Sequence, residues 1–162
     1  MAVKLDAFGR SEIGHVRGRN EDSFALRLSV GDAALFAVAD GMGGHPGGDV
    51  ASALATSVIH AWSGPERGER PIESLSRLHT AAKQRVDERS QEEPRLREMG
   101  TTLTIAMVSQ SLCYVSHIGD SRLYWLRGNR IARVTRDHTL AQEMVENGRL
   151  NREDADSHPM AN

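Results

Sequence analysis

Ala33-Ala-Leu-Phe-Ala-Val-Ala-Asp-Gly-Met-Gly-Gly-His-Pro-Gly-Gly48 joins an apolar run directly to a glycine-rich loop. Residues 33–39 show no polar alternation, which predicts a strand that is covered on both of its faces. Asp40 follows directly, so this strand ends in a carboxylate. Five glycines among the nine residues 40–48 allow the loop backbone to approach a ligand closely. We therefore expect chemistry at this strand end.

The signals on either side of this stretch predict a hairpin and two helices. Residues 24–28 form another apolar run, and the Gly-Asp turn signal between the two runs predicts a β-hairpin. From Asp49 apolar residues recur every four positions, which predicts an amphipathic helix that a Gly-Pro pair ends. A second helix is expected to begin at Pro71 and to stop before Pro94.

Beyond the second helix the pattern changes to β-branched and apolar runs. Strands are predicted over residues 101–108, 112–118, 123–126 and 131–135. A short helix is expected to follow from Thr139 and to end at Asn147-Gly148. Strands, then two helices, then more strands predict an α+β fold in which helices pack on an antiparallel sheet.

The composition limits the class of protein. The 162 residues are enough for one compact domain. A formal net charge of −2 lacks the basic excess of a nucleic-acid binder. No stretch approaches the roughly 18 apolar residues of a membrane-spanning helix. The single cysteine, Cys113, is interpreted as a small buried hydrophobic residue in a reducing compartment. We expect a cytoplasmic protein that binds neither nucleic acid nor membrane.

Three acidic clusters fall at predicted strand ends or turns: Glu21-Asp22, Asp40 and Asp120. Hard cations such as Mg²⁺ and Mn²⁺ prefer carboxylate and carbonyl oxygens, so acids beside an open glycine-rich backbone suit a cation site. Taken singly, each acid also fits a solvated turn or cap, where aspartate is favoured. The residues by themselves leave both interpretations open.

Five segments follow one another along almost the whole chain: Gly14-His-Val-Arg-Gly-Arg-Asn-Glu-Asp-Ser23, Val38-Ala-Asp-Gly-Met-Gly-Gly44, Gly100-Thr-Thr102, Ile118-Gly-Asp-Ser-Arg122 and, as a weaker match, Val134-Thr-Arg-Asp-His138. Each is short, and the set in this order is far more specific than any one of them. Together they resemble the metal-dependent protein phosphatases of the 2C type, in particular the compact bacterial serine/threonine phosphatases.

This resemblance implies a β-sandwich of antiparallel sheets flanked by helices, with two Mn²⁺ or Mg²⁺ ions at one end. By matching positions, Asp40 would bridge the two ions and Gly41 would contribute its carbonyl oxygen. Glu21 would bind one ion, and Asp22 would act through metal-bound water. Asp120 matches an acid that is linked in bacterial members to a third, more weakly held ion.

The resemblance also implies the reaction. Arg17 matches the arginine that clamps the substrate phosphate, and a planar guanidinium suits that role. With Asp40 and Glu21 it completes the expected catalytic set. The implied enzyme hydrolyses phosphoserine and phosphothreonine in proteins with water that two cations activate. Phosphorylated proteins, including a cognate serine/threonine kinase, are the expected partners. Met42 stands where many eukaryotic relatives carry a histidine proposed as general acid, so that role is not carried over.

Two later motifs of the family, each of which supplies a metal-ligating aspartate, have no counterpart in this sequence. We therefore expect residues 1–162 to be a single catalytic domain that is truncated at its C-terminus, with residues 139–162 at the start of the flap region. Strand edges left unpaired by such a truncation favour self-association.

A second hypothesis comes from a different class of protein. A non-catalytic phosphoprotein-binding module, or pseudophosphatase, would keep Arg17 and the fold but lack a complete metal site. The intact carboxylates favour retained chemistry, whereas the two missing aspartates favour binding alone. A phosphatase that acts on an anti-sigma-factor antagonist would use similar chemistry and differs only in its substrate.

Overall fold

The computed structural model describes residues 4–15, 17–30, 32–42 and 46–161. The chain divides into two compact units, one ending at His117 and one beginning at Ile118. The elements of the first are β1 (Asp22–Val30), β2 (Ala33–Asp40), α1 (Gly48–Ala61), α2 (Pro71–Glu92), the 3-10 turn η1 (Pro94–Leu96), β3 (Leu103–Ser109) and β4 (Leu112–Ile118). Those of the second are β5 (Tyr124–Arg127), β6 (Arg130–Arg133), α3 (Leu140–Glu146) and α4 (Arg152–Ala155).

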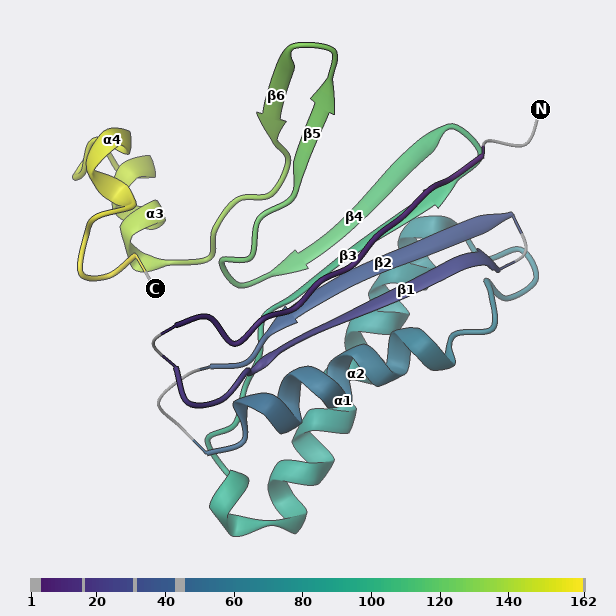
Figure 1. The fold of residues 1–162 in the computed structure, drawn as a ribbon, viewed down its shortest axis with the longest axis horizontal. Coiled ribbons are helices and arrows are strands. Elements are labelled where there is room, and N and C mark those ends of the chain that lie inside the picture. The colour runs from purple at the N-terminus through teal and green to yellow at the C-terminus, as the bar shows by residue number, and fades with distance from the viewer. Residues whose placement is uncertain (1–3, 16, 31, 43–45, 162) are drawn as a thin grey trace. The chain divides into compact units, whose positions relative to one another are not determined.

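Strands β1 to β4 form one sheet in sequence order (Figure 1). The β1–β2 pair is antiparallel, and its register places Asp22 opposite Asp40. Strand β2 is also antiparallel to β3, where Ala37 lies opposite Ile105. The predicted hairpin is therefore confirmed, and it extends to the carboxylate at the end of each strand.

One face of this sheet forms the core with the two helices. Side chains alternate along the strands, so Leu35, Ile105 and Met107 share a face and are fully buried there. Ile59 on α1 and Leu75 on α2 belong to the same buried cluster. Burial of each large side chain contributes about 1.5–3 kcal/mol, so this cluster is the main source of stability in the first unit.

The limits of the helices follow local signals. Helix α2 begins at Pro71, where the Arg70 amide donates to the Glu73 carboxylate over 2.9 Å, and it ends just before Pro94. Both predicted limits are confirmed, because proline suits the first turn of a helix and cannot continue one. Within the part of the chain that the structure describes, no helix is both long and apolar enough to cross a membrane.

Two expectations about burial are wrong. Strand β2 was expected to be covered on both faces, yet Val38 is 47% exposed, because Leu35 and Ala37 on the opposite face pack with the helices. Cys113 was expected to be buried and is exposed. It precedes Tyr114, which packs against the core, so the alternation of β4 directs Cys113 away from the helices.

The second unit is a hairpin followed by two short helices. Strands β5 and β6 pair antiparallel with Trp125 opposite Ala132, and every residue of both strands is exposed. The predicted helix after Thr139 is confirmed as α3. The Thr139 hydroxyl accepts from the Gln142 amide over 3.2 Å, and Gly148 follows the helix with φ at 68°. This capping explains why the limits of so short a helix are readable from the sequence.

One histidine in the first unit has a pKa lowered by its surroundings. His79 lies on α2, and its Nδ1 is 3.3 Å from the hydroxyl oxygen of Ser116 on β4. Its Nε2 is buried, and no described residue forms a hydrogen bond with it. Burial, and to a smaller extent the neighbouring His117, lowers the pKa of His79 below 6.5.

Acid is therefore expected to destabilise the first unit through His79. The unfolded chain takes up this proton near pH 6.5, and the folded chain takes it up only at lower pH. The free energy of unfolding consequently falls as the pH decreases from above 6.5 through the lowered folded-state pKa. His79→Gln cannot become charged and should show a flatter profile. Urea unfolding between about pH 7.5 and about pH 5 measures the difference. Equal pH slopes for the two proteins would contradict the prediction.

Candidate functional site

The acidic residues of the first hairpin meet at one end of β1 and β2. Asp22 begins β1 and lies opposite Asp40, the last residue of β2. The Gly41 amide donates to the carbonyl oxygen of Glu21 over 3.0 Å, so the backbone pairing continues past the strand ends. The antiparallel register thus brings carboxylates from two separate sequence segments to the same end of the sheet.

The backbone of Asp40 is fixed by residues that directly precede β3. The Thr102 amide donates to the Asp40 carbonyl oxygen over 2.9 Å, and the Asp40 amide donates to the Thr102 hydroxyl over 3.0 Å. The Thr101 hydroxyl donates to the same carbonyl oxygen over 2.9 Å. Both backbone polar groups of Asp40 are therefore bound, which restricts rotation of its peptide units. Both threonines belong to a sequence motif, but no local pattern indicates their role, because their partner Asp40 is about sixty positions away.

The two described ends of the glycine-rich loop lie against each other. Residues 43–45, among them the middle glycines of the sequence motif, lie outside the described residues. A Cβ on Gly41 would lie 2.2 Å from the carbonyl oxygen of Gly48. A Cβ on Gly48 would lie 3.2 Å from the carboxyl carbon of Glu21. The loop ends therefore approach each other as closely as only glycine allows, directly beside a predicted cation ligand.

Arg17 belongs to the segment that precedes β1. Its Nη1 lies 3.6 Å from Oε2 of Glu21, and the two side chains are 60% and 15% exposed, respectively. Asn20 supports this segment: its Oδ1 accepts from the Asp22 amide over 3.0 Å, and its Nδ2 donates to the Ser11 hydroxyl over 2.7 Å. The arrangement leaves an exposed guanidinium beside a largely covered carboxylate.

A second ion pair joins the same segment to the first helix. Nη1 of Arg19 lies 3.1 Å from Oδ2 of Asp49, in the first turn of α1. Oδ1 of Asp49 is buried and has no hydrogen-bond partner among the described residues. The sequence predicted Asp49 at the start of a helix, but nothing in the pattern indicated its long-range partner. The pair ties the Arg17 segment to the helix that follows the glycine-rich loop.

A cavity of about 380 Å³ opens at this end of the sheet. Glu21, Asp22 and Asp40 line it, and the carbonyl oxygen of Gly41 lies in the adjoining backbone, so the donors are of the type that Mg²⁺ and Mn²⁺ prefer. Among the described residues, no three side chains of His, Cys, Asp or Glu lie close enough together to hold a metal ion. The remaining lining residues are Glu12, Ile13, Gly14, His15, Arg17, Arg19 and Asn20.

The structure thus brings most of the expected site residues together. Arg17, Glu21, Asp22 and Asp40 line one cavity, and Gly41 is hydrogen-bonded to the backbone of Glu21. Asp120 lies in the second unit, in the connection between β4 and β5.

Comparison with known proteins identifies the family. The family model of protein phosphatase 2C matches residues 9–156, so the chain belongs to the protein phosphatase 2C family. It is 39% identical over 150 residues to the serine/threonine protein phosphatase PstP of Mycobacterium tuberculosis. The alignment covers 93% of this chain and 28% of that protein.

Solved structures show the same fold. The crystal structure of the serine/threonine phosphatase Stp1 from Staphylococcus aureus matches with a TM-score of 0.86 at 27% identity, over 94% of this chain and 61% of that one. The catalytic domain of PstP in complex with two manganese ions matches with a TM-score of 0.78 at 37% identity, over 90% of this chain and 61% of that one. The predicted α+β class, with antiparallel sheets and flanking helices, is confirmed. The chain spans less than two thirds of the length of these relatives.

Proposed function

We propose that this chain belongs to a metal-dependent protein phosphatase. The reaction would be the hydrolysis of phosphoserine and phosphothreonine in proteins. One observation carries the proposal: three carboxylates and an exposed guanidinium, from Glu21, Asp22, Asp40 and Arg17, line the same cavity. Oxygen donors for a hard cation and a cationic fork for phosphate are the two components that phosphoryl transfer to water requires.

The carboxylates have distinct tasks in this proposal. Asp40 and Glu21, with the carbonyl oxygen of Gly41, would hold two Mn²⁺ or Mg²⁺ ions, and Asp22 would orient water around them. Asp120 would serve a third ion. When bound, such cations make water a better nucleophile at neutral pH and stabilise charge on the phosphoryl oxygens. The threonines fix the backbone of Asp40, which limits the positions that its carboxylate can take.

Arg17 would bind the phosphate. Its planar guanidinium can donate two parallel hydrogen bonds to phosphoryl oxygens, and its 3.6 Å separation from Glu21 is too long for a strong hydrogen bond. A phosphate group can therefore compete for this guanidinium. Phosphorylated serine/threonine proteins, including a cognate kinase, are the proposed substrates. Residues 139–162 are proposed to begin the flap of one catalytic domain.

Asp40→Ala tests this function. Wild-type protein with Mn²⁺ is expected to release phosphate from a phosphothreonine peptide. Asp40→Ala should lower the rate by at least about a hundredfold, because it would remove a carboxylate proposed to hold the cations. Phosphate release is measured with and without a chelator. Asp32→Ala, at the exposed turn of the same hairpin, is the matched control and should retain the wild-type rate. Equal rates for Asp40→Ala and wild type would refute the proposal.

A non-catalytic phosphoprotein-binding module is the second candidate. It is favoured by the observation that no three metal-ligating side chains lie close together among the described residues. Phosphopeptide binding that depends on Arg17, without turnover at saturating Mn²⁺, would favour this candidate.

Self-association through the outer edge of β1 is also proposed, and light scattering in solution tests it.

A further inference from the structure

The second unit contains one buried carboxylate with two arginine partners. Asp137 is 7% exposed, and its Oδ2 accepts from Nε and Nη2 of Arg122 over 3.0 and 2.6 Å. Nη1 of Arg133, at the end of β6, donates to the same oxygen over 3.2 Å. A buried carboxylate is costly unless it is paired and hydrogen-bonded, so these contacts are the ones that make burial of Asp137 possible.

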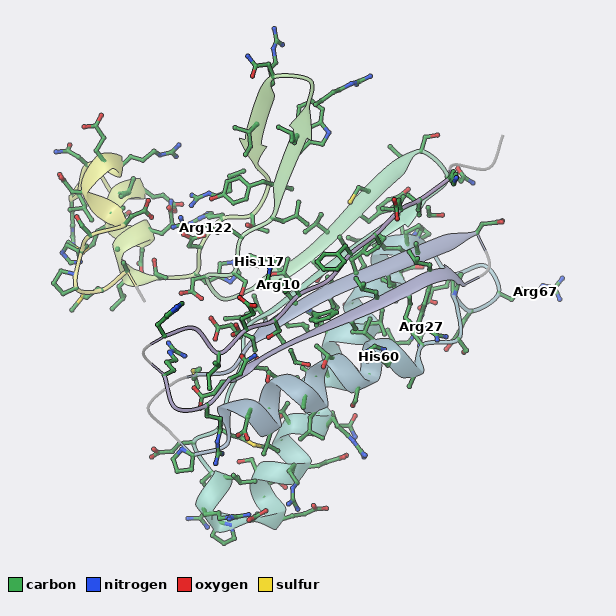
Figure 2. The ribbon with its side chains drawn as sticks, viewed as in Figure 1. Arg10, Arg27, His60, Arg67, His117 and Arg122 are labelled. Atoms are coloured by element: carbon green, nitrogen blue, oxygen red, sulfur yellow. The ribbon has the colours of Figure 1, made fainter. Side chains whose placement is uncertain are left out.

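Arg122 also reaches the end of α4. Its Nη2 donates to Oδ1 of Asp156 over 2.5 Å. Asp156 is 72% exposed, so this arm contributes little to stability. Figure 2 shows Arg122 between the β5–β6 hairpin and the helices of the second unit. The two carboxylates raise the pKa of Arg122, which therefore stays charged at every relevant pH.

Residues 119–123 form hydrogen bonds with residues 134–138 at both ends of the segment. At one end, the His138 amide donates to the Gly119 carbonyl oxygen over 2.8 Å, and the Gly119 amide donates to Nδ1 of His138 over 3.3 Å. At the other end, the Leu123 amide donates to the Thr135 hydroxyl over 2.9 Å. The Arg122–Asp137 ion pair joins the same two segments, next to the Leu123–Thr135 hydrogen bond.

Asp120 stands between the two fastened ends. Its carboxylate is partly exposed, and it forms no hydrogen bond or ion pair with the residues that the structure describes. Every link of the loop to residues 134–138 is made by its neighbours. The backbone of this loop is thus fixed by hydrogen bonds, whereas the Asp120 carboxylate can bind another partner.

We propose that Arg122 is a positioning residue, which through Asp137 holds the loop of residues 119–123 so that the Asp120 carboxylate remains available to a divalent cation. The cation part of this inference rests on the proposed phosphatase function. The Asp137 arm does the positioning, because it is buried and bidentate at the arginine. The exposed Asp156 arm connects the loop to α4 without fixing it.

Hydrogen exchange of three backbone amides tests the fastening in the full chain. The amides of Leu123, Val134 and His138 donate across the two segments and report directly on their contact. Arg122→Lys keeps the charge but loses the planar fork, so these amides should exchange at least about tenfold faster. Arg130→Lys, at the tip of the exposed hairpin, is the matched control and should exchange as the wild type does.

Asp156→Asn is the second variant, and it removes only the exposed arm. It should leave the three amides within about twofold of wild type. Equal exchange in Arg122→Lys and wild type would overturn the proposal. So would an acceleration in Asp156→Asn as large as in Arg122→Lys, because the buried arm would then not be the one that positions the loop.

A Mn²⁺ titration followed by electron paramagnetic resonance separates positioning from a merely structural role. The component of Mn²⁺ binding that depends on Asp120 is identified by its loss in Asp120→Asn. The Mn²⁺ affinity of this component is expected to be at least about fivefold weaker in Arg122→Lys than in the wild type. Equal Mn²⁺ affinity in Arg122→Lys and the wild type would overturn the cation part of the inference. So would Mn²⁺ binding that Asp120→Asn does not change. Failure of the phosphatase proposal is read separately, from phosphate release by Asp40→Ala.

Discussion

Gly41→Ala is expected to lower the free energy of unfolding by about 2–3 kcal/mol and to abolish the proposed phosphatase activity. The new Cβ would lie 2.2 Å from the carbonyl oxygen of Gly48 and 2.3 Å from its carbonyl carbon. Backbone atoms cannot move aside as the end of a flexible side chain can. The two ends of the glycine-rich loop must therefore separate, and Glu21, whose carboxyl carbon lies beside Gly48, loses its surroundings.

Gly18→Ala is the matched control for this substitution. It introduces the same methyl group, and nothing lies within 4 Å of the new Cβ. Urea unfolding should show a lower midpoint for Gly41→Ala with an unchanged slope, and Gly18→Ala should resemble the wild type. Unfolding curves for Gly41→Ala and Gly18→Ala that coincide would show that the loop ends do not touch in solution.

Ile105→Ala is expected to cost about 2–5 kcal/mol in the free energy of unfolding. Ile105 is fully buried on β3, in the cluster that joins the sheet to α1 and α2. Truncation leaves a cavity that the small alanines around it cannot fill. Ile72→Ala removes the same atoms from a side chain that is 51% exposed on α2, and it should cost less than about 1 kcal/mol.

Thermal and urea unfolding of both isoleucine variants would measure this difference. If Ile72→Ala proved as destabilising as Ile105→Ala, the difference in burial between the two side chains would not hold in solution. A loss confined to Ile105→Ala would instead support the burial of Ile105 in the cluster formed by the sheet and the two helices.

Most of the fold could be predicted because its signals are local. Proline marks both ends of α2, and an Asn-Gly pair marks the end of α3. The facing positions of Asp22 and Asp40 do not follow from the turn alone, because the register of the hairpin shifts between Arg27 and Val30.

The remaining features depend on contacts that no local pattern carries. The burial of β2 and Cys113 depends on which face the helices choose, and an unbroken apolar run gives no sign of that choice. The hydrogen bonds of Thr101 and Thr102 to Asp40 connect distant segments. The Arg122–Asp137 pair likewise forms only after a hairpin has folded between its two partners.

The distribution of tryptophan gives each unit its own optical label. Trp62, in the first unit, is 4% exposed, and Trp125, on the fully exposed hairpin of the second unit, is 47% exposed. These are the only tryptophans in the sequence. The buried indole should emit at shorter wavelength and resist quenching by iodide, whereas the hairpin indole should emit at longer wavelength and be quenched readily. A single fluorescence titration can therefore follow the unfolding of the two units as separate signals from unlabelled protein.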